Sequence, residues 1–108
     1  MLLDKSMTTN EVVKIKQEEG DYWIKITFEL TRNIHPLELK DIINKFPEVK
    51  GNKILLLSGR APIWMYGSLV HKYVHLVQAV GIYDPKINGY VIVATHSNNI
   101  STGDIVFV

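Results

Sequence analysis

A chain of 108 residues, of which 46% are apolar and 21% charged, has the size and composition of one folded domain. It contains no cysteine, which excludes disulfides and thiolate metal ligands, and no apolar run approaches the roughly 20 residues that span a bilayer. A net charge of +1 is too small to indicate binding of duplex DNA. A cytoplasmic location is the default expectation for such a chain.

The charge is unevenly distributed along the chain. Residues 1–48 carry seven Lys/Arg against nine Asp/Glu, whereas residues 49–108 carry five against two and hold three of the four histidines. The basic second half is compatible with a phosphate-bearing ligand. An imbalance this small is equally compatible with no function at all.

The first elements predicted from the pattern are two strands. Residues 1–11 lack periodicity and are expected to form a flexible extension, so that residues 12–108 make up the single domain. Residues rich in β-branched and aromatic side chains at 12–17 and 22–30 flank a turn at 18–21, which indicates a hairpin. Apolar and polar side chains alternate in the second strand, as expected when one face is buried.

Two helices and four further strands follow. Pro36 suits the first turn of a helix, whose apolar residues recur at helical spacing until Pro47 ends it. The later elements are a buried strand at 52–57, a helix from Ile63 to about Val77, and strands at 79–83, 90–95 and 104–108. The order ββαβαβββ predicts an α+β fold, in which one sheet is covered by two helices.

Two histidines lie on the second predicted helix. His71 and His75 are four residues apart, so both rings can project from one face and reach a common metal ion. This spacing also occurs on many helices that bind nothing. Helical zinc proteases need a glutamate directly after the first histidine, where this chain has Lys72. The pattern therefore argues against a protease.

Asp84 and His96 are further candidates, because each ends a predicted strand. A carboxylate and an imidazole near strand ends are ligand types that suit manganese. Asp84 precedes Pro85 and could equally be a turn opener, and His96 could equally be a polar residue at a strand end. Both interpretations remain open from the residues alone.

Ser58, Gly59 and Arg60 lie between a buried strand and a helix, where open sheets commonly bind ligands. Gly59 would let backbone amides approach an anion, and the helix start adds partial positive charge. Arg60 is one of only two arginines among twelve basic residues, and its planar fork fits phosphate. The alternative is a plain strand-to-helix turn with an exposed arginine.

Taken together, these motifs resemble the third family of CRISPR ring nucleases, earlier described as a manganese-dependent deadenylating ribonuclease. The resemblance covers about Val12 to Val108. It rests on Ser58-Gly59-Arg60-Ala61-Pro62-Ile63-Trp64, His71-Lys72-Tyr73-Val74-His75, Tyr83-Asp84-Pro85-Lys86, His96-Ser97 and Gly103-Asp104, in that order.

The resemblance implies a ferredoxin-like sandwich, a homodimer and cleavage of cyclic tetra-adenylate to short linear oligoadenylates, which would switch off type III CRISPR signalling. It also implies that binding and cutting occur on opposite faces, so that two dimers enclose one ring. The resemblance also suggests single-stranded RNA 3′ ends as a further partner, and neither a membrane nor duplex DNA is expected as one.

The same resemblance assigns the residues. Ser58, Gly59 and Arg60 fall on the binding motif, together with Lys86, which stands where an arginine is usual. His75 and Asp84 fall on the catalytic motif. The manganese ligands it implies are His71, Asp84 and His96.

Manganese would polarise the scissile phosphate, and His75 could act as general base or acid. The sequence leaves open whether water or the ribose 2′-hydroxyl is the nucleophile. Two other readings compete with the enzyme: a sensor that binds an oligoadenylate or an RNA 3′ end without cutting it, and an interaction subunit whose histidines are structural.

Overall fold

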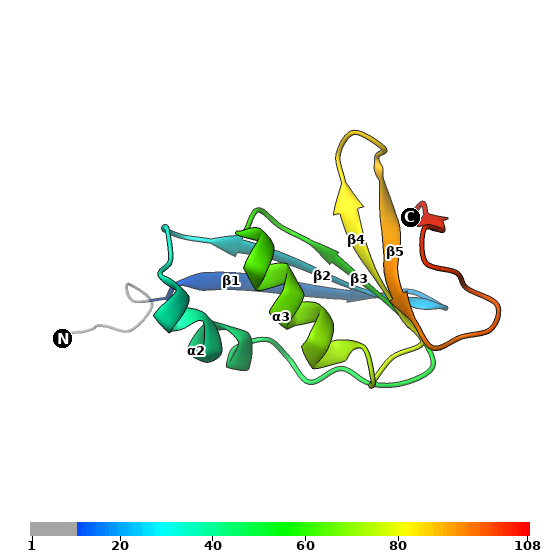
Figure 1. The fold of residues 1–108 in the computed structure, drawn as a ribbon, viewed down its shortest axis with the longest axis horizontal. Coiled ribbons are helices and arrows are strands. Elements are labelled where there is room, and N and C mark those ends of the chain that lie inside the picture. Colours follow the sequence, from blue (N-terminus) through cyan, green and yellow to red (C-terminus); the bar gives the residue numbers. More distant parts are fainter. Residues whose placement is uncertain (1–10) are drawn as a thin grey trace.

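The computed structural model describes residues 11–108, which form one six-stranded sheet with two α-helices and a short 3₁₀ helix (Figure 1). The extension predicted over residues 1–11 lies, except for Glu11, outside the described residues. The fold is α+β, and the predicted order ββαβαβββ is confirmed. In chain order the elements are β1 (Val13–Glu19), β2 (Trp23–Leu30), η1 (Pro36–Glu38), α2 (Leu39–Asn44), β3 (Ile54–Ser58), α3 (Ile63–Tyr73), β4 (Ala79–Asp84), β5 (Gly89–Thr95) and β6 (Ile105–Val106).

The strands lie in the sheet in the order of the sequence, from β1 to β6. The central strands β2, β3 and β4 are parallel, whereas β1 and the pair β5 and β6 add antiparallel strands on either side. Parallel neighbours need a long crossover, and here each crossover carries a helix. A ferredoxin-like sheet would insert another strand inside each β-α-β unit. These units have adjacent strands, so the ferredoxin-like arrangement is not confirmed.

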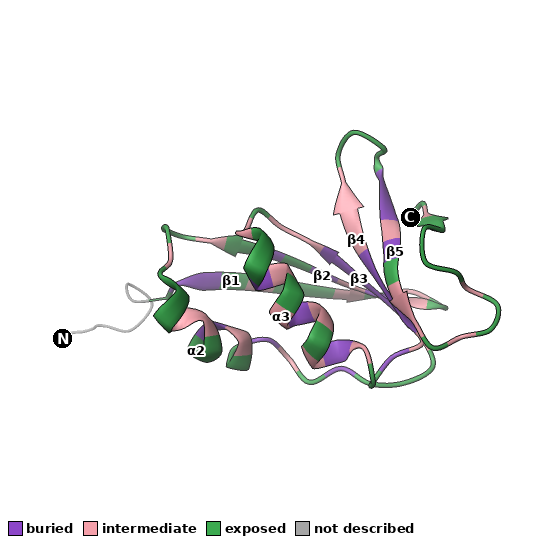
Figure 2. Ribbon diagram, viewed as in Figure 1, coloured by how far each residue is buried: buried purple, intermediate pink, exposed green. Residues whose placement is uncertain are grey.

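Both helices cover the same face of the sheet, where the larger core lies (Figures 1 and 2). The alternation predicted in β2 is observed, because Ile24, Ile26 and Phe28 are buried in that core. Met65, Leu69 and Tyr73 of α3 pack there and are fully buried. Burial of each such side chain stabilises the fold by roughly 1.5–3 kcal/mol.

A smaller core lies on the other face of the sheet. Ile54, Leu56, Ala79, Tyr90 and Ile92 are buried there, and the partly buried residues packed against them come from both the sheet and the C-terminal segment: Trp23, Tyr83, Ile100 and Val106. Because β3 contributes to both cores, its four apolar residues are all buried. This explains the continuous apolar run from which a fully buried strand was predicted.

The second helix is shorter than its apolar pattern predicts. α3 ends at Tyr73, and Val77 lies beyond the helix although it is buried in the larger core. The backbone turns at this point, where the amide of Leu76 donates to the carbonyl of Tyr73. The helical spacing of apolar residues extends to Val77 because this side chain packs in the same core as α3, although the helix itself has ended.

The sheet has two very different edges. β1 is seven residues long, whereas β6 has two. Lys14, Lys16, Glu18 and Glu19 make four of the seven residues of β1 charged. Neither α2 nor α3 has the length and apolar character that a bilayer crossing requires, and the same holds for η1, the remaining helix of residues 11–108.

Candidate functional site

The loop between β3 and α3 is held tightly against β2. A side chain at Gly59 would place its Cβ atom 2.5 Å from the carbonyl oxygen of Phe28 and 2.8 Å from its ring. The hydroxyl of Tyr66, whose pKa is raised to about 12 by burial, donates to the Gly59 carbonyl at 2.5 Å. Glycine is therefore required here by packing against the neighbouring strand. This is a different reason from the anion approach that the sequence suggested.

Arg60 leaves this loop and lines a cavity of about 600 Å³. Its side chain makes no hydrogen bond or ion pair with any residue from 11 to 108. The cavity lies between the loops that follow β2 and β3, and its lining is Leu30, Thr31, Arg32, Asn33, Ile34, Arg60, Ala61 and Pro62. Ser58, the last residue of β3, and Gly59 do not line the cavity. The volume is within the range of ligand pockets.

Arg32 and Asn33 were missed by the sequence interpretation, although a signal was present. Arg32 is the other of the two arginines and lies two residues beyond the carboxyl end of β2, which ends at Leu30. Because β2 and β3 are parallel neighbours, their following loops meet at one edge of the sheet. Had that pairing been recognised, both arginines would have been assigned to one site.

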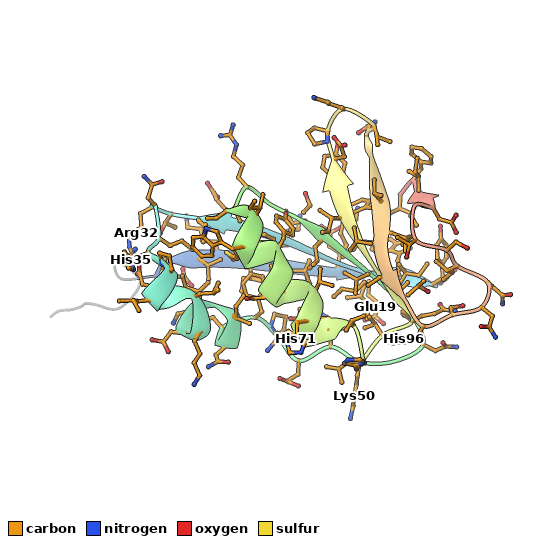
Figure 3. The ribbon with its side chains drawn as sticks, in the orientation of Figure 1. Glu19, Arg32, His35, Lys50, His71 and His96 are labelled. Atoms are coloured by element: carbon orange, nitrogen blue, oxygen red, sulfur yellow. The ribbon has the colours of Figure 1, made fainter. Side chains whose placement is uncertain are left out.

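The structure separates the two histidines that the sequence placed on one helix face. His71 is exposed on α3, and it lines a cavity of about 430 Å³ between α2 and α3. His75 lies beyond the end of α3 at Tyr73, and it lines a different cavity. Figure 3 shows that His71 projects from the helical layer. Within one chain, these two rings therefore do not share a site.

His75 instead meets His96. Their ring centroids are 5.1 Å apart and the ring planes are inclined by 28°, so the imidazoles stack. This contact arises because β4 and β5 are antiparallel, which brings the end of β5 beside the start of β4: the His96 amide donates to the Gln78 carbonyl at 3.2 Å. The pair lines a cavity of about 390 Å³ formed by Gly51, Asn52, His75, Leu76, Val77, Gln78, His96 and Ser97.

Asp84 and Lys86 lie at the turn between β4 and β5. The Asp84 carboxylate accepts a hydrogen bond from the Lys86 amide at 2.9 Å, and its carbonyl accepts from Ile87 and Asn88. Asp84 is thus a turn opener, which is one of the two roles that the sequence left open. The length of β4, about 17 Å from Ala79 to Asp84, separates it from the histidine pair at the strand's other end.

No metal site is complete within the described part of one chain. Among residues 11–108, no three His, Asp or Glu side chains are grouped so that they could hold an ion. In particular His71, Asp84 and His96, the predicted manganese ligands, lie in three places. The stacked pair offers two imidazole donors, and among residues 11–108 no third His, Asp or Glu side chain joins them.

Two polar centres therefore lie at opposite ends of the parallel strands. The arginine-lined cavity is at the carboxyl ends of β2 and β3, and the histidine pair is at the amino end of β4. An arginine cavity can bind a phosphate, and an imidazole pair can transfer protons. Figure 3 shows the two ends through Arg32 on one side of the molecule and His96 on the other.

The chain is similar both to a described protein family and to a protein of known sequence. The profile of a family described as CRISPR-associated protein (Cas_csx3) matches residues 27–107, which include every candidate site residue named above. A protein of Aquifex aeolicus (strain VF5), described as uncharacterized, is 39% identical over 108 residues. That similarity covers 90% of this chain and 96% of the relative.

Proposed function

The chain belongs to the Cas_csx3 family of CRISPR-associated proteins, and from this premise we propose that it is a metal-dependent phosphodiesterase. Its proposed substrate is cyclic tetra-adenylate, which it would open to short linear oligoadenylates and so end type III CRISPR signalling. The observation that carries the proposal is the stacked pair of His75 and His96 at the opposite end of the strands from Arg60.

The arginine-lined cavity supports binding of the phosphodiester backbone. The Arg60 guanidinium has no partner among residues 11–108, so its donors are available to phosphate oxygens. The loop that carries it is fixed by the Gly59 contact with Phe28 and by the Tyr66 hydroxyl. A fixed loop loses little conformational entropy when a ligand binds.

The histidine pair supports cleavage. Imidazole can accept a proton from an attacking hydroxyl or donate one to a leaving oxygen near neutral pH. We assign proton transfer to His75 and positioning of the His75 ring to His96, which stacks on it. The neighbouring side chains in this cavity, Asn52, Gln78 and Ser97, can donate hydrogen bonds to phosphate oxygens.

Manganese is the proposed cofactor, and when bound it would neutralise charge on the phosphate. The proposed donors are His96 and Asp84, which lie at opposite ends of β4 in one chain, so that His75 stays free for proton transfer. These two donors do not meet within residues 11–108 of one chain, so a site that uses both would take one of them from a second chain. Stacking of homodimers around the ring would meet this requirement, because it would bring the histidine pair of one molecule close to Asp84 of the next.

A second candidate is a sensor that binds the oligoadenylate without cutting it. The exposed Arg60 and its cavity favour this function as strongly as they favour the enzyme, because binding needs only that end of the sheet. The sensor has no use for the histidine pair, so the two functions differ in what happens when His75 is replaced.

Incubation of the full chain with cyclic tetra-adenylate and manganese, with and without chelator, tests the proposal by chromatography of the products. We expect metal-dependent cleavage, which His75→Ala lowers by roughly 100- to 10,000-fold while binding persists. His71→Ala is the matched control, because this histidine lines another cavity. Binding without turnover would establish the sensor, and neither binding nor turnover would defeat both functions.

A further inference from the structure

A second guanidinium lines the same cavity as Arg60. Arg32 lies in the loop after β2, and the cavity of about 600 Å³ is lined by both arginines together with neutral and apolar residues. Arg60 has no partner within residues 11–108, whereas Arg32 is held in place by three hydrogen bonds, one within its own loop and two to Glu38 of η1.

Those three bonds use only one part of the Arg32 guanidinium. Nη1 donates to the Asn33 carbonyl at 3.1 Å and to Oε2 of Glu38 at 3.2 Å, and Nη2 donates to Oε1 of Glu38 at 2.7 Å. Glu38 is fixed in turn, since its Oε2 accepts from the His35 amide at 2.8 Å in the capping box of η1. The carboxylate thus holds the outer edge of the guanidinium.

Two of the five donors remain. These are Nε–H and the second Nη2–H, and neither donates to another residue of the described range 11–108. They lie side by side on the lateral edge of the planar group, which is the arrangement that binds two oxygens of one phosphate. About half of the side chain is exposed, at 54%, and it lines the cavity, so the group is within reach of a ligand there.

We propose that Arg32 is a second phosphate-binding residue, whose lateral edge takes a phosphate of the oligonucleotide while Arg60 takes a neighbouring one. This inference rests on the proposed function, which names Arg60 alone in this cavity. Glu38 serves as the positioning residue, because it fixes the guanidinium plane before the ligand arrives and so reduces the entropy lost on binding.

Binding of cyclic tetra-adenylate to the full chain without metal, where turnover does not interfere, tests this assignment. Arg32→Gln should weaken binding roughly ten- to hundred-fold, and Arg32→Lys should recover only part, because lysine keeps the charge without the fork. Glu38→Gln should weaken it by less than Arg32→Gln. Lys45→Gln, which removes an exposed charge outside the cavity, should leave it within about twofold.

The salt dependence of binding separates direct contact from a structural role. Loss of a phosphate contact should reduce the slope of log K against log salt by about 0.7 in Arg32→Gln and leave it unchanged in Glu38→Gln. Equal losses in both variants would show that Arg32 acts only through its loop, which overturns the inference. Arg32→Gln binding like Lys45→Gln would also overturn it. If Arg60→Gln alone weakens binding, the proposed function survives without Arg32, whereas no binding by the parent chain defeats both.

Discussion

Glu38 accepts hydrogen bonds from the Arg32 guanidinium and from the His35 amide, and these lower its pKa to about 2. A carboxyl whose pKa is lowered on folding stabilises the folded state above its ordinary pKa of 4.5. That contribution is lost as the pH falls from 4.5 toward 2. The ion pair and the capping box of η1 should therefore weaken together in this window.

Titration of the Glu38 side-chain carboxyl by NMR should give a midpoint near 2 in the parent chain. In Arg32→Gln the midpoint should rise toward 4.5 yet stay below it, because the His35 amide still donates. An unchanged midpoint in Arg32→Gln would show that the guanidinium does not govern this carboxylate.

For single residues, the sequence named side chains that line cavities but did not predict which of them lie together. His75, His96 and Arg60 were each named as candidates, and each lines a cavity. The stacking of His75 on His96 could not be predicted, because it depends on where α3 ends and on the register of β4 with β5. Arg32 was missed because its contribution depends on parallel strand pairing.

Two glycines differ in the space around them: Gly59 is packed against β2, whereas Gly67 on α3 has free space where a side chain would lie. Gly59→Ala should destabilise the fold by about 1–3 kcal/mol, since its Cβ would lie 2.5 Å from the Phe28 carbonyl of β2, which cannot move without disturbing the sheet. Chemical denaturation would measure this change in the free energy of unfolding.

Gly67→Ala is the matched control within α3. A Cβ there has no neighbour within 4 Å, and alanine is a better helix former, so stability should rise by about 0.5–1 kcal/mol. If both variants shift stability in the same direction, the tight packing of the β3–α3 loop is not what requires glycine at position 59.

The types of the elements were predictable because burial of one face makes apolar residues recur along the sequence with the period of a strand or a helix. The alternation of Ile24, Ile26 and Phe28 indicated a half-buried strand, and the apolar run of β3 indicated a strand buried on both faces. Strand order was not predictable, because pairing between β2, β3 and β4 depends on crossovers that leave no period in the sequence. The helix end was misplaced because Val77 packs in the same core as α3.

For the whole molecule, the separation of the arginine cavity from the histidine pair predicts complementation between preformed dimers. Arg60→Ala dimers keep the histidine end, and His75→Ala dimers keep the binding end. Neither should cleave cyclic tetra-adenylate alone. On mixing, cleavage should return and rise steeply with total protein, because the active assembly needs one dimer of each kind.

The measurement is the rate of ring opening against the concentration of the mixture. Native mass spectrometry of dimers that carry different isotope labels would check that subunits have not exchanged. Without exchange, continued inactivity of a mixture of folded variants would contradict the two-ended assembly, while the proposal that the parent chain is a phosphodiesterase would still stand.

The unequal edges of the sheet restrict how copies can associate. β1 is long enough to template a neighbouring strand, but its run of charges opposes strand addition, and β6 is too short to template one. Growth into a continuous intermolecular sheet, which is the route to amyloid-like fibrils, is therefore disfavoured at both edges of the sheet. Copies of a chain with this geometry can associate through other surfaces without their strands joining into one continuous sheet.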